Sequence, residues 1–248
     1  MKKLVVGALF IASSFFSIAQ DITVEEIVGN YIENVGGVDA WNSLEGHKMV
    51  ASAAMQGMDI PVEVVSLKDG RKITKYSVQG QELVQDAYDG ETLWAISFMT
   101  MKAEKMESED TENYTREMGE FPDALMTYAE LGYTLELDGE DSKDGVDCYK
   151  LKLTKNTQLV EGTEVENVVY YYIDKENFIP IVVETTIMAG EMKGQVVETL
   201  FSDYQEVEGL YFPFAITNQT AMGSFVLQIE SIELNPEVED EMFAYPAE

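Results

Sequence analysis

From Gly46 onward the chain consists mainly of short segments in which apolar and polar residues alternate. Met49, Ala51, Ala53 and Met55 lie on one phase of the first such segment. Alternation with a period of two places successive side chains on opposite faces of a strand. Asp-Gly and similar pairs separate many of the segments, and such pairs form the tight turns of hairpins. The pattern predicts a meandering antiparallel sheet of roughly eleven strands.

The expected strands are spread over almost the whole chain, with one long interruption. They lie within residues 46–55, 62–67, 71–80, 82–98, 133–139, 148–154, 166–174, 179–188, 195–207, 210–220 and 224–234. A sheet of this size twists and curls, so its concave face needs cover. A closed barrel, a sandwich and a curled half-barrel under helices all satisfy this need.

Two helical regions favour the half-barrel. Thr23 and Glu26 form a T-x-x-E capping box, apolar residues then recur at helical spacing, and Gly36-Gly37 ends the helix. A second short helix is expected over residues 39–44, and residues 99–131 are expected to form a helical or loop lid. We therefore predict a mainly β (α+β) fold, an incomplete barrel covered by the N-terminal helix and this mid-chain lid.

The segment Leu210–Ile216 departs from alternation, because it is apolar on both phases. Its sequence LYFPFAI places Tyr211, Phe212 and Phe214 around Pro213, and proline in a strand marks an edge or a bulge. One interpretation is that one face packs in the core and the other meets an apolar ligand. The alternative is that both faces are ordinary core, as in strands covered on two sides.

The first nineteen residues have the features of a signal peptide. Lys2 and Lys3 precede an apolar stretch, and Ser17-Ile18-Ala19 supplies small residues for cleavage after Ala19. A retained N-terminal anchor is the alternative. No linker divides the remainder, so residues 20–248 are expected to form one exported, periplasmic domain.

Charge and composition narrow the function classes. Asp and Glu number 46 against 16 Lys and Arg, which gives a net charge of −30. This charge disfavours nucleic acids, anionic membrane surfaces and stable membrane insertion, although acidity also serves solubility alone. His47 is the sole histidine and is expected at the surface, and the single Cys148 is expected to be buried and inert. We expect no catalytic residue, metal or cofactor.

Several stretches together resemble the LolA-like periplasmic lipoprotein carriers, the outer-membrane lipoprotein-sorting proteins. They are, in order, GGVDAWNSLEG after the first helix, YDGETLW (88–94), YYYIDKENFIPIVVE (170–184), SDYQEVEGLYFPFAI (202–216) and ESIELNPEVEDEMFAYP (230–246). The resemblance covers nearly the whole chain after the leader. It implies an apolar cavity for lipoprotein acyl chains, no cofactor, an inner-membrane release complex as donor and an outer-membrane receptor as acceptor.

The resemblance also directs the choice of site residues. The predicted acyl cavity comprises Met49, Met55, Val64, Trp94, Phe98, Met99, Met101, Leu135, Leu151, Tyr171, Phe201, Phe214 and Leu227. Methionines suit such a wall because thioether side chains repack readily. Arg71 is the nearest counterpart of the family's lid-locking arginine, although DGRK stands here in place of arginine followed by proline.

Two other functions stay open at this point. The same fold could serve an envelope sensor or binding module that reads lipids or lipoproteins without transferring them. An acidic hydrolase would instead place two carboxylates at glycosidase separation in a cleft.

Overall fold

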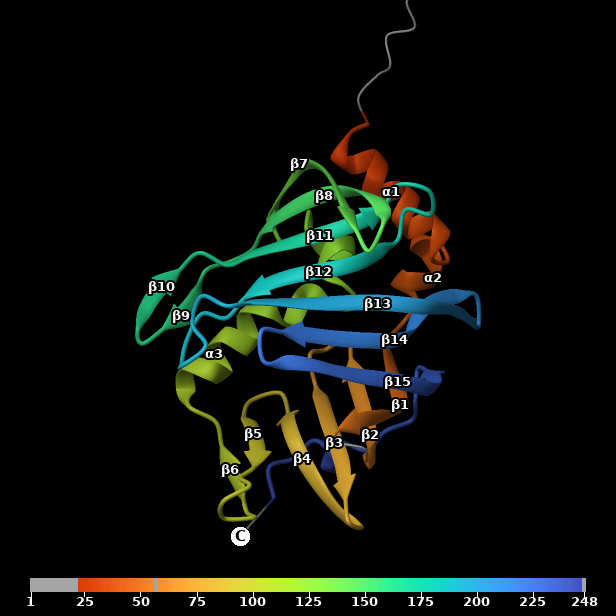
Figure 1. The fold of residues 1–248 in the computed structure, drawn as a ribbon. Helices are drawn as coiled ribbons and strands as arrows, with labels where there is room; N and C mark the ends of the chain where they lie inside the picture. Colours follow the sequence, from red (N-terminus) through yellow and green to blue (C-terminus); the bar gives the residue numbers. More distant parts are fainter. Residues whose placement is uncertain (1–21, 56–57, 247–248) are drawn as a thin grey trace, which may run out of the picture.

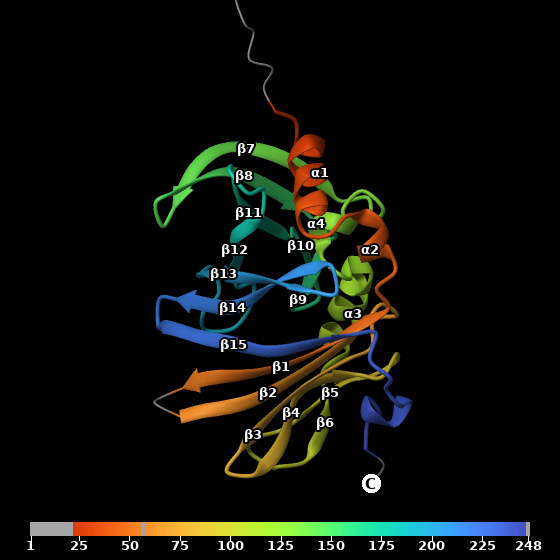
Figure 2. The same ribbon diagram turned by 90° about the vertical axis from the view of Figure 1, so that its right-hand side faces the viewer.

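The computed structural model describes residues 22–55 and 58–246, and the predicted signal peptide lies outside them. Thirteen strands form one antiparallel sheet that curls without closing into a barrel (Figure 1). Helices cover the sheet on one side, and hairpin turns lie at the opposite side (Figure 2). The predicted incomplete barrel under helices is confirmed.

The strands meander along the sheet in nearly sequential order. From one edge to the other they are β6 (Ala103–Lys105), β5 (Leu93–Ile96), β4 (Gln81–Tyr88), β3 (Lys72–Val78), β2 (Met58–Leu67), β1 (Gly46–Met55), β15 (Gly223–Leu234), β14 (Leu210–Thr220), β13 (Val196–Val207), β12 (Pro180–Thr186), β11 (Val168–Asp174), β8 (Val146–Thr154) and β7 (Thr134–Lys143). Two further strands, β9 (Gln158–Val160) and β10 (Thr163–Val165), pair separately.

The topology explains why the mid-chain segment acts as cover. β1 pairs with β15 in the middle of the sheet, and the chain runs from β1 outward to β6 at one edge. The next strand, β7, forms the opposite edge, so the intervening residues must cross the sheet. They do so as α3 (Ser108–Glu117), the 3₁₀ turn η1 (Met118–Glu120) and α4 (Ala124–Thr127). The crossing places α4 against the concave face beside α1.

The N-terminal helix α1 (Val24–Asn34) begins at the predicted capping box. The Glu26 N–H donates to Thr23 Oγ1 at 3.2 Å, and the Thr23 N–H donates to Glu26 Oε2 at 2.9 Å. Its buried face packs on the sheet through Ile27 and Tyr31. A second short helix, α2 (Val38–Asn42), follows and buries Trp41 in the same core.

The structure has more strands than the alternation predicts. β6, β9 and β10 contain three residues each, which is too short for a period of two to be recognised. β7 also extends to Lys143, beyond the predicted end at residue 139. Its hairpin turn is Asp144-Gly145, where both residues have positive φ, as a type I′ turn requires.

β14 and β15 separate at the apolar segment that follows Gly209. They pair only from Ala215 to Thr220, whereas the later part of β15 pairs with β1. The first half of β14, which contains Pro213, therefore has a ladder neighbour only in β13. Proline has no N–H to donate to a ladder, and Pro213 lies where β14 has no partner strand on one side. The predicted local edge at Pro213 is confirmed.

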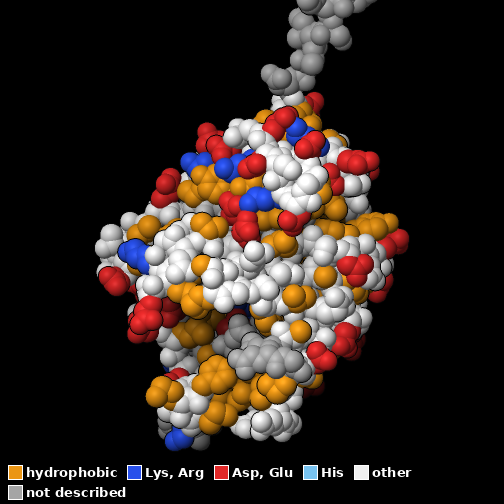
Figure 3. Space-filling view, in the orientation of Figure 1, with side chains coloured by type: hydrophobic (Ala, Val, Ile, Leu, Met, Phe, Trp, Pro, Cys, Tyr) orange, Lys and Arg blue, Asp and Glu red, His pale blue; other side chains and the backbone are white. Residues whose placement is uncertain are grey.

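A second core lies on the other face of β2–β5. It comprises Val65, Ile73, Val84, Ala87, Trp94 and Phe243, and Phe243 comes from the C-terminal segment after the 3₁₀ turn η2 (Asp240–Met242). On the concave side, Tyr114 of α3 packs against Tyr88 of β4, with 4.8 Å between the ring centres. In Figure 3, hydrophobic side chains gather over the lower strands of the sheet.

Candidate functional site

The site is a pocket of about 330 Å³ between the concave face and the covering helices. Most of its lining is apolar or aromatic. The lining residues are Tyr31, Trp41, His47, Met49, Pro122, Asp123, Met126, Tyr171, Pro180, Val183, Phe201, Tyr204, Tyr211, Phe212, Pro213 and Ile216. The half of β14 that does not pair with β15 supplies Tyr211, Phe212 and Pro213. The separation of these two strands therefore contributes one wall of the pocket.

Asp123 is the one carboxylate among these lining residues. Its Oδ2 accepts a 2.7 Å hydrogen bond from the Tyr31 hydroxyl, and its Oδ1 accepts one of 2.7 Å from the Leu125 N–H. The second bond caps α4, and the first ties α1 to it. Burial raises the pKa of the Asp123 carboxyl, and the two donors only partly oppose this rise. Part of the residue stays accessible to solvent.

Three tyrosines of the pocket lie near enough to this carboxyl to feel its charge. Burial raises the pKa of Tyr31, Tyr171 and Tyr204, and the nearby Asp123 raises each further. The Tyr204 hydroxyl donates to the main-chain oxygen of Pro180 at 2.7 Å. All three stay neutral at physiological pH. Because no lysine or arginine is among the lining residues of the described chain, the pocket offers no cation.

The structure corrects the surface position expected for His47, which lines the pocket. Its ring stacks on Phe121 at 5.6 Å, and its buried Nδ1 has no hydrogen-bond partner among the described residues. Burial lowers the pKa of His47 to about 4, so the ring is neutral at pH 7. The reason lies in its position: β1 begins directly after α2, and the strand passes beneath the mid-chain segment.

A smaller cavity of about 140 Å³ lies on the other side of one wall of the pocket. Trp41, Pro122 and Met126 line both spaces. Trp41 is fixed in place, because its Nε1 donates to Val35 O at 3.1 Å and its ring meets the edge of Phe212 at 5.1 Å. Met126 has no such anchor in its side-chain chemistry, since a thioether is only a weak acceptor.

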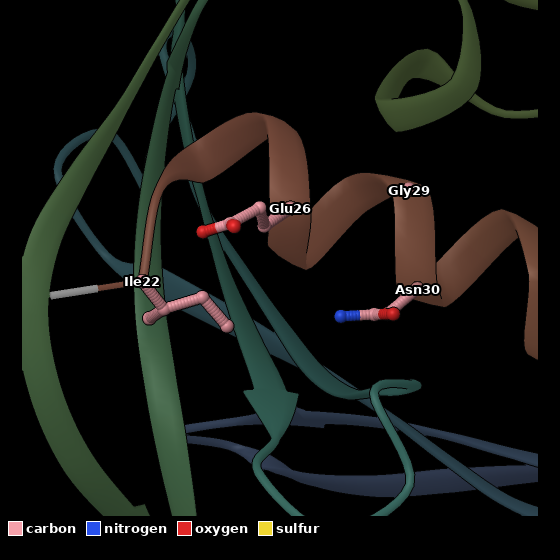
Figure 4. Close-up of a pocket in the computed structure, with 4 residues that line it drawn as sticks. All are labelled: Ile22, Glu26, Gly29 and Asn30. Carbon is pink, nitrogen blue, oxygen red and sulfur yellow. The ribbon is translucent and has the colours of Figure 1, made fainter. Parts of the chain in front are cut away.

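A third hollow runs along the outer side of α1. Its volume is about 550 Å³, but only Ile22, Glu26, Gly29 and Asn30 line it. Figure 4 shows these residues on α1 and just before it, with no side chain from another element labelled around the space. We regard it as a surface depression, because so few residues contribute to its wall.

Part of the predicted cavity set lies together at this site. Met49, Tyr171 and Phe201 line the pocket. Leu151 and Phe214 belong to the core around it, with Leu135 and Leu227 packed against that core. Val64 pairs with Met49 across β1 and β2 and so shares its face. That these residues contact a ligand stays a prediction.

The other predicted residues lie elsewhere. Trp94 belongs to the second core, on the face away from Met49. Phe98, Met99 and Met101 lie in or beside the β5–β6 turn, with 69%, 95% and 45% of their surface exposed. The side chain of Met55 lies outside what the structure describes.

Arg71, the predicted lid latch, binds the C-terminal segment. It forms ion pairs with Asp69 and Asp240, and its guanidinium lies 5.4 Å from the centre of the Phe243 ring. The neighbouring Gly70 oxygen accepts a 2.6 Å hydrogen bond from Tyr114 of α3. The β2–β3 turn therefore contacts both the C-terminal segment and the mid-chain lid.

Sequence reasoning missed the polar residues of the pocket, Tyr31, Asp123 and Tyr204. Asp123 carried one usable signal, because aspartate before a short apolar helix is a typical N-cap. The helical spacing of apolar residues indicates only that Tyr31 belongs to the apolar face of α1. The side chains that meet around Asp123 come from α1, β11 and β13, which alternation alone does not bring together.

Two general properties of the described residues complete the site. No group of three or more His, Cys, Asp or Glu side chains within residues 22–55 and 58–246 could hold a metal ion. Among the helices of that same part, none is long and apolar enough to cross a membrane.

Solved structures of other proteins share the fold, among them the three described here. A LolA superfamily protein from Nitrosomonas europaea has 16% identity and a TM-score of 0.56, with 90% of this chain and 98% of that chain covered. A DUF1329 family protein from Desulfovibrio piger gives the same four values. A protein from Vibrio parahaemolyticus is described as a putative outer membrane lipoprotein-sorting protein domain. It has 12% identity and a TM-score of 0.54, with 89% of this chain and 97% of that chain covered. At such identities the likeness concerns the fold.

Sequence comparison adds a family. A search of curated proteins finds no match. A family model described as "Uncharacterized protein" matches residues 116–246, more than half of the chain, and spans the strands from β7 to β15 and the C-terminal segment. The chain therefore belongs to the family that this model describes, and it shares its fold with the LolA superfamily protein and the lipoprotein-sorting protein domain named above.

Proposed function

We propose that this chain is a non-enzymatic periplasmic carrier that binds the acyl chains of lipid-modified proteins and shuttles them toward the outer membrane. The observation that carries the proposal is the pocket of about 330 Å³, whose walls are mostly aromatic and aliphatic side chains. Buried apolar pockets of about 300–1,000 Å³ are typical of small-ligand sites. The fold shared with lipoprotein-sorting proteins supports the same assignment.

The free energy of transfer from water favours binding of an acyl chain. A sixteen-carbon chain would gain on the order of 12 kcal/mol on leaving water, at about 0.8 kcal/mol per methylene. The pocket is at the small end of the usual range, so it suits one chain of modest length. A protein with several acyl chains would require α1 and α4 to move away from the sheet.

The proposal is tested by ligand binding and by transfer. Native mass spectrometry of the purified protein, before and after incubation with a triacylated lipopeptide, should show bound acyl compounds. Ile216→Trp places a large ring in the pocket, and we expect it to weaken binding by at least tenfold while the protein stays folded. Val196→Trp is the matched control, because Val196 is 48% exposed on β13.

The outcomes separate the candidate functions. Absence of any bound acyl compound would contradict both the carrier and the lipid sensor. Binding without transfer of the lipopeptide to outer-membrane vesicles would favour the sensor. A glycosidase-like hydrolase needs two carboxylates, and Asp123 is the one carboxylate among the lining residues within the described chain.

A further inference from the structure

The pocket wall is not uniformly apolar, and none of its polar side chains is a cation at pH 7. Asp123 carries acceptor oxygens, and the tyrosines and His47 are neutral groups. No lysine or arginine from the described residues reaches the lining. A ligand group placed near Asp123 therefore meets acceptors and phenols but no cation.

The Asp123 carboxylate can accept further hydrogen bonds. A carboxylate offers about four acceptor positions, and here one bond comes from Tyr31 and one from Leu125. The remaining positions suit an N–H or O–H group on a ligand. A second carboxylate in the same place would be poorly tolerated, because a negative charge buried without a cation is strongly unfavourable.

Two effects disfavour an anionic ligand at this place, namely the charge of Asp123 itself and the absence of a lysine or arginine from the lining. If Asp123 is ionised, it repels a second anion directly. If it is protonated, it can share its proton with a bound carboxylate, yet the pair still retains one buried negative charge with no lysine or arginine in the lining to balance it.

We infer that Asp123 makes the pocket selective for uncharged acyl compounds that donate a hydrogen bond beside the chain, such as N-acyl amides, against free fatty acids. The inference rests on the proposed function, since it names the class of acyl ligand for the same pocket. It assigns Asp123 as the specificity-determining residue and Tyr31 as the group that orients its carboxylate.

The test compares three ligands with the same twelve-carbon chain at pH 8, using displacement of the fluorescent probe N-phenyl-1-naphthylamine. N-lauroylglycine methyl ester is uncharged and has an amide N–H. Methyl laurate is uncharged and has no donor, and laurate is an anion. We expect laurate to bind at least tenfold more weakly than the amide, with methyl laurate in between.

Variants then assign the selectivity to one residue. Asp123→Asn keeps the shape and removes the charge of Asp123 but does not supply a cation, so the preference for the amide over laurate should fall by at least about threefold without disappearing. Asp110→Asn is the matched control, because Asp110 is exposed on α3, and it should retain the preference of the unaltered protein. If Asp123→Asn fails to fold, Tyr31→Phe removes the donor that orients the carboxylate, so the preference for the amide over methyl laurate should fall while the discrimination against laurate is kept.

The results distinguish this inference from the proposed function. Equal binding of all three ligands to the unaltered protein would overturn the inference and leave the acyl carrier standing. An unchanged preference in Asp123→Asn would overturn the assignment to Asp123. If none of the three ligands displaces the probe, the proposed function itself fails.

Discussion

The indole nitrogen of Trp94 donates a 2.9 Å hydrogen bond to the main-chain oxygen of Phe243, 149 positions further along the chain. Phe243 is fully buried, and Trp94 is 3% exposed. The contact fixes the C-terminal segment to the outer face of β2–β5. The outer face of this end of the sheet is thereby covered, whereas the pocket lies on the concave face.

We predict that Phe243→Ala lowers the free energy of unfolding by about 3–5 kcal/mol, because it removes a large buried side chain and leaves a cavity. Urea denaturation followed by circular dichroism measures the change. Phe98→Ala is the matched control: Phe98 is 69% exposed, and its loss should cost less than about 1 kcal/mol. Similar losses for the two variants would contradict the role given to the C-terminal segment.

The single histidine allows a direct measurement of burial. Since His47 is the only histidine, the proton on its Cε1 gives a single resonance of its type in the untagged protein. The midpoint of its titration should lie near pH 4, because burial lowers the pKa from 6.5 to about 4. A midpoint near 6.5 would mean that the ring is solvated and does not line the pocket.

The same shift links His47 to stability. Between pH 6.5 and 4 the unfolded chain binds the proton and the folded chain does not, so the free energy of unfolding falls as the pH falls. The loss should be on the order of 3 kcal/mol. We expect His47→Phe, which retains an aromatic ring against Phe121, to lose this contribution when denaturation is repeated across the pH range.

Asp123 should affect the pH dependence of the free energy of unfolding with the opposite sign to His47. Its pKa in the folded state lies above the ordinary value of 3.8, so the folded chain holds the proton more tightly than the unfolded chain. Its contribution to stability therefore falls as the pH rises from about 4 through the folded-state pKa, by up to about 1.4 kcal/mol per pH unit. Asp123→Asn should remove this slope, measured as the difference between the two proteins from pH 4 to 8. A constant difference over that range would contradict the burial of the carboxyl.

Cys148 should be unreactive in the folded protein. It is fully buried on β8, and burial raises the pKa of its thiol. The Ellman reagent should modify it about 100-fold or more slowly in buffer than in denaturant, because reaction requires local opening. Rapid modification of the native protein would show that this face of β8 opens easily.

The sequence predicts the parts of this fold that depend on local pattern. The capping box at Thr23, the hairpin turns and the phase of strands such as β8 follow from spacing alone, and they lead to the half-barrel. The phase of Met49 and Tyr171 also places both at the pocket. Trp94 is harder to place, because its phase does not reveal that Phe243 returns to cover the outer face.

The polar centre of the site could not be predicted in the same way. Tyr31 and Asp123 are 92 positions apart, and their hydrogen bond exists because the mid-chain segment crosses the sheet to reach β7. Strand alternation gives each strand's faces but not which strands become neighbours at the edges. Residues that meet through such a crossing are visible only in the three-dimensional arrangement.

The wall shared by the two cavities has a consequence for ligand size. One of its three members, Met126, is an unbranched side chain with rotatable bonds on a helix of four residues. We expect a change in its torsion angles to widen the connection between the two spaces without disturbing a strand pairing. The wall between the two spaces can therefore adapt through Met126, and the length of guest that the pocket admits depends on this thioether as well as on the curvature of the sheet.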